Sequence, residues 1–243
     1  MNFFHVSYAH RGLHNLNVGI PENSLPAFSY ALLHGYGIEL DIQLTKDEKV
    51  VVFHDAMLSR VCGLDVPLVS KTYEELQELS LFSTNEKIPL LTDVLKLING
   101  SVPLLIEIKL TNLNTRTCFL ADQILRTYQG AYMIESFNPM ALRWYKLHHP
   151  SVIRGQLSAN LFGRTLGGSK ILTSLLSSNL FLNFLSRPDF LSYNYKDTNN
   201  INYQILTKIF HIPVMGWTFI SEKDYLNYRF LFNSIIFENF IPY

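Results

Sequence analysis

Two acidic residues and a histidine stand close together in the segment GIELDIQLTKDEKVVVFHD, residues 37–55. Glu39 and Asp41 are two positions apart among branched apolar residues, so they project from the same face of an extended strand. Two carboxylates on one face repel each other unless a cation lies between them. Mg²⁺ and Ca²⁺ prefer oxygen ligands of this kind. The pair therefore indicates a site for a divalent cation.

The same segment returns a histidine toward these carboxylates. The polar sequence TKDEK predicts a hairpin around Thr45–Lys49 with Leu44 opposite Val50. That register places His54 level with the two carboxylates, and Asp55 follows as a group that can orient it. From this stretch alone two interpretations stay equally open: an imidazole that works beside a metal site, or a solvated hairpin with surface charges.

Two further strand ends favour the catalytic interpretation. The sequence AHRG places His10 and Arg11 at the end of the first apolar run, and VPLLIEIKL carries Glu107 and Lys109 on one face of a strand. Charges inside an apolar strand are costly unless they are paired or bind an ion. Glu107 can therefore complete a three-carboxylate cation site. Arg11 and Lys109 supply positive charge for an anionic substrate, and Arg11 offers a bidentate fork for phosphate.

This set of side chains is suited to phosphoryl transfer. Histidine is the side chain whose ordinary pKa lies near neutral, so His10 and His54 can act as acid and base on opposite sides of one bond. A metal ion together with cationic side chains stabilises charge on phosphoryl oxygens. No GxSxG motif occurs in the chain, so serine-based acyl transfer is not indicated.

The elements that must position these residues are short apolar runs alternating with helical patterns. The runs predict strands because they are rich in Val, Ile, Phe and Tyr and are bounded by turn residues. The expected strands are Phe3–Ala9, Gly37–Leu44, Val102–Leu110, Ala131–Ser136, Val152–Leu157, Phe190–Tyr193, Val214–Phe219 and Ser234–Glu238. The expected helices are Ser24–His34, with Asn23 as its cap, and Thr72–Leu79, Thr92–Ile98, Thr117–Tyr128, Pro139–His148 and Asn202–Phe210.

Alternating strands and helices in a chain of 243 residues predict an α/β protein, a (β/α)₈ TIM barrel. A doubly wound sheet is the alternative, disfavoured because no GxGxxG turn follows the first strand. In a barrel the active site lies at the C-terminal ends of the strands, where the residues above are found. We expect one domain over residues 1–243, with a small helical insertion after the second strand at about residues 56–98.

Composition excludes several other classes of protein. Twenty basic residues balance twenty acidic ones with no basic run, so nucleic acid is not an expected partner. The two cysteines have no metal-ligand spacing, which argues against a zinc site. The N-terminus has no signal-peptide pattern, and no apolar stretch is long enough to span a membrane. A cytoplasmic protein is therefore expected.

With these residues in place, the sequence resembles the glycerophosphodiester phosphodiesterase family. The matching blocks are AHRG (9–12), PENSLPAF (21–28), residues 37–55 and LLIEIK (104–109), with weaker support from SFNP (136–139) and GWT (216–218). The resemblance implies a barrel with an insertion after the second strand. It also implies metal-dependent hydrolysis of glycerophosphodiesters to sn-glycerol 3-phosphate and an alcohol such as choline or ethanolamine.

The resemblance further implies roles for individual residues. They are His10 and His54 as the acid and base, Glu39, Asp41 and Glu107 as ligands of Ca²⁺ or Mg²⁺, Arg11 and Lys109 as phosphate contacts, and Trp217 packed against the substrate. The glycerol 2-hydroxyl would attack phosphorus, and water would then open the cyclic phosphate. For Trp217 alone, a core position is as well supported as a substrate contact.

Two other functions compete with this one. The apolar segment 161–190 predicts either a helix packed on the barrel with a loop wall, or a lipid-facing lid with peripheral lipid contact. A lid would suit a lysophospholipase D-like or phospholipase-like barrel that acts on acylated lipids. The remaining alternative is a non-catalytic barrel that binds phosphodiesters. The sequence leaves the head group, the cation and the oligomeric state open.

Overall fold

The structure is a computed structural model that describes residues 3–110, 113–158, 186–199 and 201–242. It divides into two compact units, one made of Tyr8–Tyr132 and the other of Asn2–Ser7 with Met133–Tyr243. Most of the apolar segment 161–190 lies outside the described residues, so its predicted role as a helix or a lid is not addressed by the structure. Among the helices of the described ranges, none combines the length and apolar character needed to cross a bilayer.

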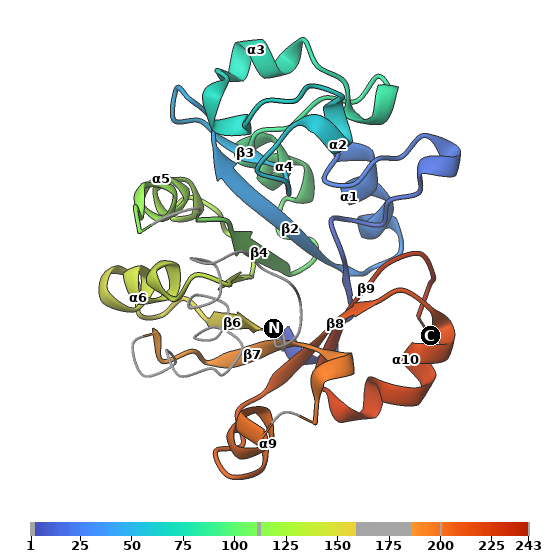
Figure 1. Ribbon diagram of the computed structural model, residues 1–243, viewed down its shortest axis with the longest axis vertical. Helices are drawn as coiled ribbons and strands as arrows, with labels where there is room; N and C mark the ends of the chain where they lie inside the picture. The colour runs from blue at the N-terminus through green and yellow to red at the C-terminus, as the bar shows by residue number, and fades with distance from the viewer. Residues whose placement is uncertain (1–2, 111–112, 159–185, 200, 243) are drawn as a thin grey trace. The chain divides into compact units, whose positions relative to one another are not determined.

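The first unit contains three parallel strands and a hairpin. Strand β1 (Tyr8–Ala9) pairs with β2 (Gly37–Leu44), which pairs with β4 (Leu104–Ile108). Strand β3 (Val50–Val52) runs antiparallel to the C-terminal part of β2, and Figure 1 shows it beside that long arrow. Leu44 lies opposite Val50, which confirms the hairpin register predicted from the TKDEK turn.

The first strand is shorter than the sequence predicts. Phe3–His5 form a 3-10 turn, η1, and only Tyr8 and Ala9 join a sheet. Tyr8 pairs with Gly37, and a Cβ at Gly37 would stand only 2.7 Å from the ring of Tyr8. The missing side chain at Gly37 therefore makes room for the tyrosine ring where the two strands meet.

Helices cover the strands of this unit, and an insertion follows β3. The helices are α1 (Leu25–Leu33), α2 (Ser59–Cys62), α3 (Tyr73–Gln77), α4 (Leu91–Ile98) and α5 (Arg116–Leu125), and the 3-10 turns are η2 (Leu16–Val18), η3 (Leu68–Ser70) and η4 (Leu81–Ser83). The cap of α1 is Ser24 rather than the expected Asn23, because the Ser24 hydroxyl accepts from the Ala27 amide. Asn23 is turned to another partner, described below.

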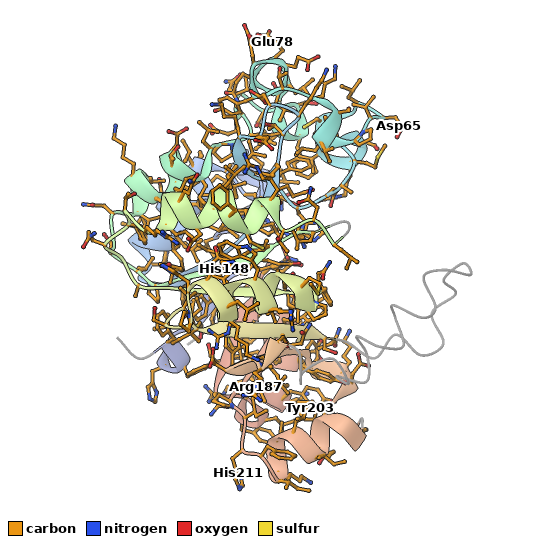
Figure 2. The ribbon with its side chains drawn as sticks, turned by 90° about the vertical axis from the view of Figure 1, so that its left-hand side faces the viewer. Asp65, Glu78, His148, Arg187, Tyr203 and His211 are labelled. Carbon is orange, nitrogen blue, oxygen red and sulfur yellow. The ribbon has the colours of Figure 1, made fainter. Side chains whose placement is uncertain are left out.

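The insertion has its own small apolar core. Leu58, Val61 and Leu68 pack there with Leu76 and Leu81. A capping box at Thr72 starts α3, with the Thr72 and Glu75 side chains bonding to each other's backbone amides. Figure 2 shows its charged Asp65 and Glu78 pointing away from this core. Packing of this kind gives α2 a fixed position after β3.

The second unit supplies five parallel strands. They are β5 (Tyr132–Ser136), β6 (Arg154–Ser158), β7 (Phe190–Asn194), β8 (Val214–Phe219) and β9 (Ser234–Phe237), paired in chain order. Its helices are α6 (Pro139–His148), α9 (Ile201–Lys208) and α10 (Glu222–Tyr228), with 3-10 turns η5 (Tyr195–Asp197) and η6 (Arg229–Leu231). Figure 1 shows β7, β8 and β9 side by side in orange to red.

The predicted fold class is confirmed. The described residues of the two units carry eight parallel strands alternating with helices, the arrangement of a (β/α)₈ barrel. Helix α10 was not among the expected helices. Its Ser221 cap is present, but its buried face consists of one residue, Tyr225, so the helical periodicity is weak.

We expect Gly12→Ala to be strongly destabilising, because two costs add at this position. Gly12 has φ of +79°, and an added Cβ would lie 2.9 Å from both Ala27 and Phe28. The matched control is Gly19→Ala, where φ is +75° but nothing lies within 4 Å of the new Cβ. Thermal unfolding should show a loss of about 1–3 kcal/mol beyond that of the control. Equal losses in the two variants would mean that the α1 contact is not tight.

Candidate active site

Three carboxylates meet between the middle of β2 and the C-terminal end of β4. Asp41 lies directly opposite Glu107 in the parallel register, and Glu39 is one pleat earlier on β2. Their side chains are buried, with ligand oxygens that all lie within 4.8 Å of one another. The alternation of side chains along the two strands is the local reason that the sequence brings these three together.

Cationic groups reach into the carboxylate cluster. The Lys109 Nζ lies 2.9 Å from Asp41 Oδ1 and 2.7 Å from Glu107 Oε2. The Arg11 Nε lies 3.6 Å from Asp41 Oδ2, and Asn23 donates a 2.9 Å hydrogen bond to the same oxygen. Asp41 is therefore the centre of the cluster, with two cations and one amide directed at it.

The two facing carboxyl groups differ in their proton affinity. Burial acts to raise the pKa of Asp41, but the positive charges of Lys109 and Arg11 and the hydrogen bond from Asn23 outweigh it and hold this pKa well below its ordinary value. Burial raises the pKa of Glu107 to about 7, and the charge of Asp41 adds to the rise against the opposing effect of Lys109. Asp41 is thus the permanently ionised member of the pair.

The donor set of this cluster fits a divalent cation. Carboxyl groups offer oxygen ligands, and three of them converge at a buried point into which Lys109 and Arg11 direct positive charge. Oxygen ligands of this type are those of Mg²⁺ and Ca²⁺. The buried acidic cluster can therefore hold a metal ion, and its residues are those expected from the sequence.

His10 and Arg11 follow β1 and face the same cluster. The His10 Nε2 lies 4.0 Å from Glu39 Oε2, and the Arg11 backbone amide donates a 2.9 Å hydrogen bond to the same oxygen. Arg11 has φ of +55°, in the left-handed region. This backbone turn lets residue 11 direct its amide at Glu39 and its guanidinium at Asp41 and Glu22.

His54 is held from two sides. Its Nδ1 lies 2.6 Å from Asp55 Oδ1, which leaves Nε2 for other partners. The buried Gln43, on the same face of β2 as Asp41, directs its Nε2 at three successive carbonyl oxygens, those of residues 53, 54 and 55. Burial lowers the pKa of His54, and together with the positive charges of Lys109 and Arg11 it outweighs the opposing effects of Asp41 and Asp55. The neutral imidazole is therefore favoured.

Glu22 and Arg60 belong to the surroundings of the site, although the sequence analysis assigned them no role. Glu22 accepts from Arg11, and Arg60 of α2 contacts both Glu22 and Asp55. Asn23, expected as a cap, instead donates to Asp41. Within one sequence Glu22 had a usable signal, since PENS directly precedes α1 at the end of a barrel loop. Arg60 had no such sequence signal, because its spacing from His54 fits no simple periodicity.

Trp217 lies in the second unit, whereas all the other expected site residues lie in the first. It is near the C-terminal end of β8, and its ring meets Phe137 edge-on with 5.8 Å between centroids. Among the described residues its buried Nε1 has no hydrogen-bond partner. Its contact with substrate stays a prediction.

Comparisons with known proteins agree with this geometry. A model of the glycerophosphoryl diester phosphodiesterase family matches residues 10–160. YhdW of Bacillus subtilis, provisionally named a glycerophosphodiester phosphodiesterase, is 27% identical over 224 residues, which cover 88% of this chain and 86% of YhdW. A glycerophosphodiester phosphodiesterase of Caldanaerobacter subterraneus is 32% identical over 161 residues, 61% of this chain and 65% of the relative.

A solved structure supports the fold. A phosphodiesterase of Oleispira antarctica, solved in complex with the product sn-glycerol-3-phosphate, is similar with a TM-score of 0.78. The two chains are 22% identical, and the match covers 96% of this chain and 92% of the other. At that identity the structural similarity supports the barrel fold alone. The evidence for the type of reaction is the family match.

Proposed function

The chain belongs to the glycerophosphoryl diester phosphodiesterase family, and on this basis we propose that it hydrolyses glycerophosphodiesters to sn-glycerol 3-phosphate and an alcohol. Family membership makes it a phosphoric diester hydrolase. The single observation that carries the proposal is the buried cluster of Glu39, Asp41 and Glu107, with cations directed into it from two sides. Such a cluster suits a metal-assisted reaction of an anionic ester.

We assign the acid and base roles to His10 and His54. In the first step one histidine removes the proton of the glycerol 2-hydroxyl while that oxygen forms a bond to phosphorus. The bond to the alcohol's oxygen breaks, and the other histidine gives this leaving oxygen a proton. In the second step water opens the cyclic phosphate with the two roles reversed. The neutral His54 is suited to act as the first base, since Asp55 holds its Nδ1.

The charged side chains have two roles in this proposal, binding of the cation and orientation of the phosphate. Glu39, Asp41 and Glu107 would hold a divalent cation, which when bound supplies charge stabilisation at a phosphoryl oxygen. Arg11 and Lys109 orient the anionic phosphate through their donors. Both cations are already held by carboxylates, so they lose little conformational freedom when substrate binds.

The substrate class follows from the family and from one structural relative. The Oleispira antarctica protein holds sn-glycerol-3-phosphate, and we propose a small glycerophosphodiester as the partner of this chain too. The single-domain organisation over residues 1–243 and the cytoplasmic location stay predictions.

We expect the purified protein to release glycerol 3-phosphate from glycerophosphocholine and glycerophosphoethanolamine when Mg²⁺ or Ca²⁺ is present. Excess chelator should abolish the release, and adding back the cation should restore it, because the carboxylates of the cluster then regain their counter-ion. A coupled assay for glycerol 3-phosphate measures the rate.

Three results would count against this function. Release that is unaffected by chelator would remove the cation from the proposal. Activity on lysophospholipids alone would favour the barrel acting on acylated lipids. Binding of glycerophosphodiesters by a metal-loaded, folded protein without any turnover would favour the non-catalytic barrel.

A further inference from the structure

Arg60, in helix α2 of the insertion, bridges two carboxylates that belong to different loops. Its Nη1 and Nη2 donate to Glu22 at 2.8 and 2.7 Å. Its Nε and Nη2 donate to Asp55 at 2.7 and 3.1 Å. One guanidinium thus makes a two-point contact with each carboxylate, which is the geometry that fixes orientation as well as distance. We call these four contacts the Arg60 bridge.

Each carboxylate of the Arg60 bridge also contacts a residue of the proposed reaction. Glu22 Oε1 accepts a 2.6 Å bond from Arg11, the phosphate-orienting arginine. Asp55 Oδ1 lies 2.6 Å from Nδ1 of His54. The chain of contacts therefore runs from Arg11 through Glu22, Arg60 and Asp55 to His54.

Charge and packing both favour a fixed position for Arg60. Burial would raise the pKa of Glu22 and Asp55, but hydrogen bonds from Arg60 hold both pKa values below the ordinary range, so both carboxylates stay charged. The guanidinium also lies 5.6 Å from the ring centroid of Phe82, a cation–π contact within the insertion. Phe82 has φ of +48°, so its ring is presented by a turn in the left-handed region.

Without Arg60, two carboxylates near one another would lose their shared counter-ion. They would then move apart or compete for the remaining donors. Either change reaches His54 and Arg11, since Glu22 would draw Arg11 with it and Asp55 would release Nδ1 of His54. The side chain of Arg60 is itself 45% exposed, whereas that of Glu22 is 11% exposed. Arg60 therefore acts from the surface on groups that lie deeper.

We propose that Arg60 is a positioning residue through which the insertion sets the orientation of His54 and Arg11. The proposal rests on the proposed function for its effect on turnover. Arg60 holds the ring of His54 by way of Asp55, and it holds the guanidinium of Arg11 by way of Glu22. The insertion is accordingly part of the catalytic apparatus, although its apolar core packs separately.

The kinetic test compares Arg60→Ala and Arg60→Lys with the wild type. Misplacement of His54 should lower kcat by about 10- to 100-fold in Arg60→Ala. Arg60→Lys keeps the charge but lacks the planar guanidinium, so its kcat should lie between those of Arg60→Ala and the wild type. Because the side chain is partly exposed, methylguanidinium at non-denaturing concentration should restore part of the lost rate in Arg60→Ala and have no effect on the wild type.

The matched control is Arg116→Ala. Arg116 makes the same kind of two-point contact with Glu48, at 2.9 and 2.7 Å, and its side chain is 43% exposed, but neither partner touches the carboxylate cluster. This variant should keep the wild-type kcat and gain nothing from methylguanidinium. An Arg60→Ala protein that keeps its kcat, or loses rate without rescue while Arg116→Ala loses as much, would overturn the proposal.

A spectroscopic measurement separates this proposal from the proposed function. Nitrogen-15 NMR of the histidine rings reports the tautomer and hydrogen bond of His54 without any substrate. Arg60→Ala should change the Nδ1 signal of His54, and Arg116→Ala should leave it unchanged. If wild-type protein hydrolyses no glycerophosphodiester but the signal changes as expected, the function fails and the positioning role stands. An unchanged signal in Arg60→Ala defeats the positioning role itself.

Discussion

Replacing either His10 or His54 by alanine is expected to lower kcat on glycerophosphocholine by about 10²–10⁴-fold, the range that a positioned acid or base contributes. The two losses should be similar, since each step of the proposed reaction needs one histidine to take a proton and the other to give one. KM should change much less than kcat, because Arg11, Lys109 and the carboxylate cluster stay in place.

The surroundings of the two rings differ, and this gives the prediction a second part. Asp55 holds Nδ1 of His54 at 2.6 Å, so His54→Asn removes the proton acceptor but keeps a polar group beside Asp55. His10 lies 4.0 Å from Glu39 and is only partly exposed. We expect His54→Asn to be as inactive as His54→Ala but to unfold at a higher temperature, which separates the loss of chemistry from the loss of a hydrogen bond.

The control is His34→Ala. His34 ends helix α1 in the same unit, is exposed, and uses its Nδ1 against the Tyr30 carbonyl. Its loss should leave kcat unchanged. If His10→Ala or His54→Ala keeps more than about a tenth of the wild-type rate, the loss is smaller than a positioned acid or base contributes. That result would remove the histidine concerned from the mechanism.

Strand periodicity made the carboxylate cluster predictable. Glu39 and Asp41 alternate with apolar residues on β2, Glu107 does so on β4, and parallel pairing sets Asp41 against Glu107. The hairpin was predictable for a similar reason, since the polar turn fixed its register. The first strand was not, because Phe3–His5 have the composition of a strand yet turn as η1 before Tyr8 reaches its partner.

The contacts that hold the site residues in place could not be predicted from the sequence. Arg60 meets Glu22 across 38 residues of chain, and the same guanidinium meets Asp55, five residues before it in the chain. Gln43 lies on the same face of β2 as Asp41, so strand periodicity places it near the site. Its three carbonyl partners depend on the backbone conformation after β3, which periodicity does not predict. Contacts made by loops follow no repeat, whereas contacts made by strands do.

Asp41→Asn and Glu107→Gln are expected to abolish cation binding alike but to differ sharply in stability. In the presence of chelator, Asp41→Asn leaves Lys109 and Arg11 facing a neutral group in a buried site. Removal of one partner from a buried pair costs about 3–5 kcal/mol. Glu107→Gln resembles the protonated acid that burial favours at this position, and its amide oxygen can still accept from Lys109.

The pH dependence of Glu107 fixes the sign of its contribution. Its pKa rises to about 7 in the folded protein from an ordinary value near 4.5, so the folded chain holds a proton that the unfolded chain has released. The stability from this group is therefore complete below about pH 4.5 and is lost as the pH rises through about 7. In chelator, Glu107→Gln should gain stability relative to the wild type as the pH is raised from about 5 to 7, within that window.

Denaturant unfolding in chelator and calorimetric titration with Mg²⁺ or Ca²⁺ would measure the two effects separately. Asp122→Asn is the matched control, because Asp122 is a buried carboxylate of α5 that lies outside the cluster, so its variant should bind the cation normally. If Glu107→Gln proves as unstable as Asp41→Asn at about pH 6, then Glu107 is ionised in the metal-free protein. The assignment of Asp41 as ionised and Glu107 as protonated in the metal-free protein would then be wrong.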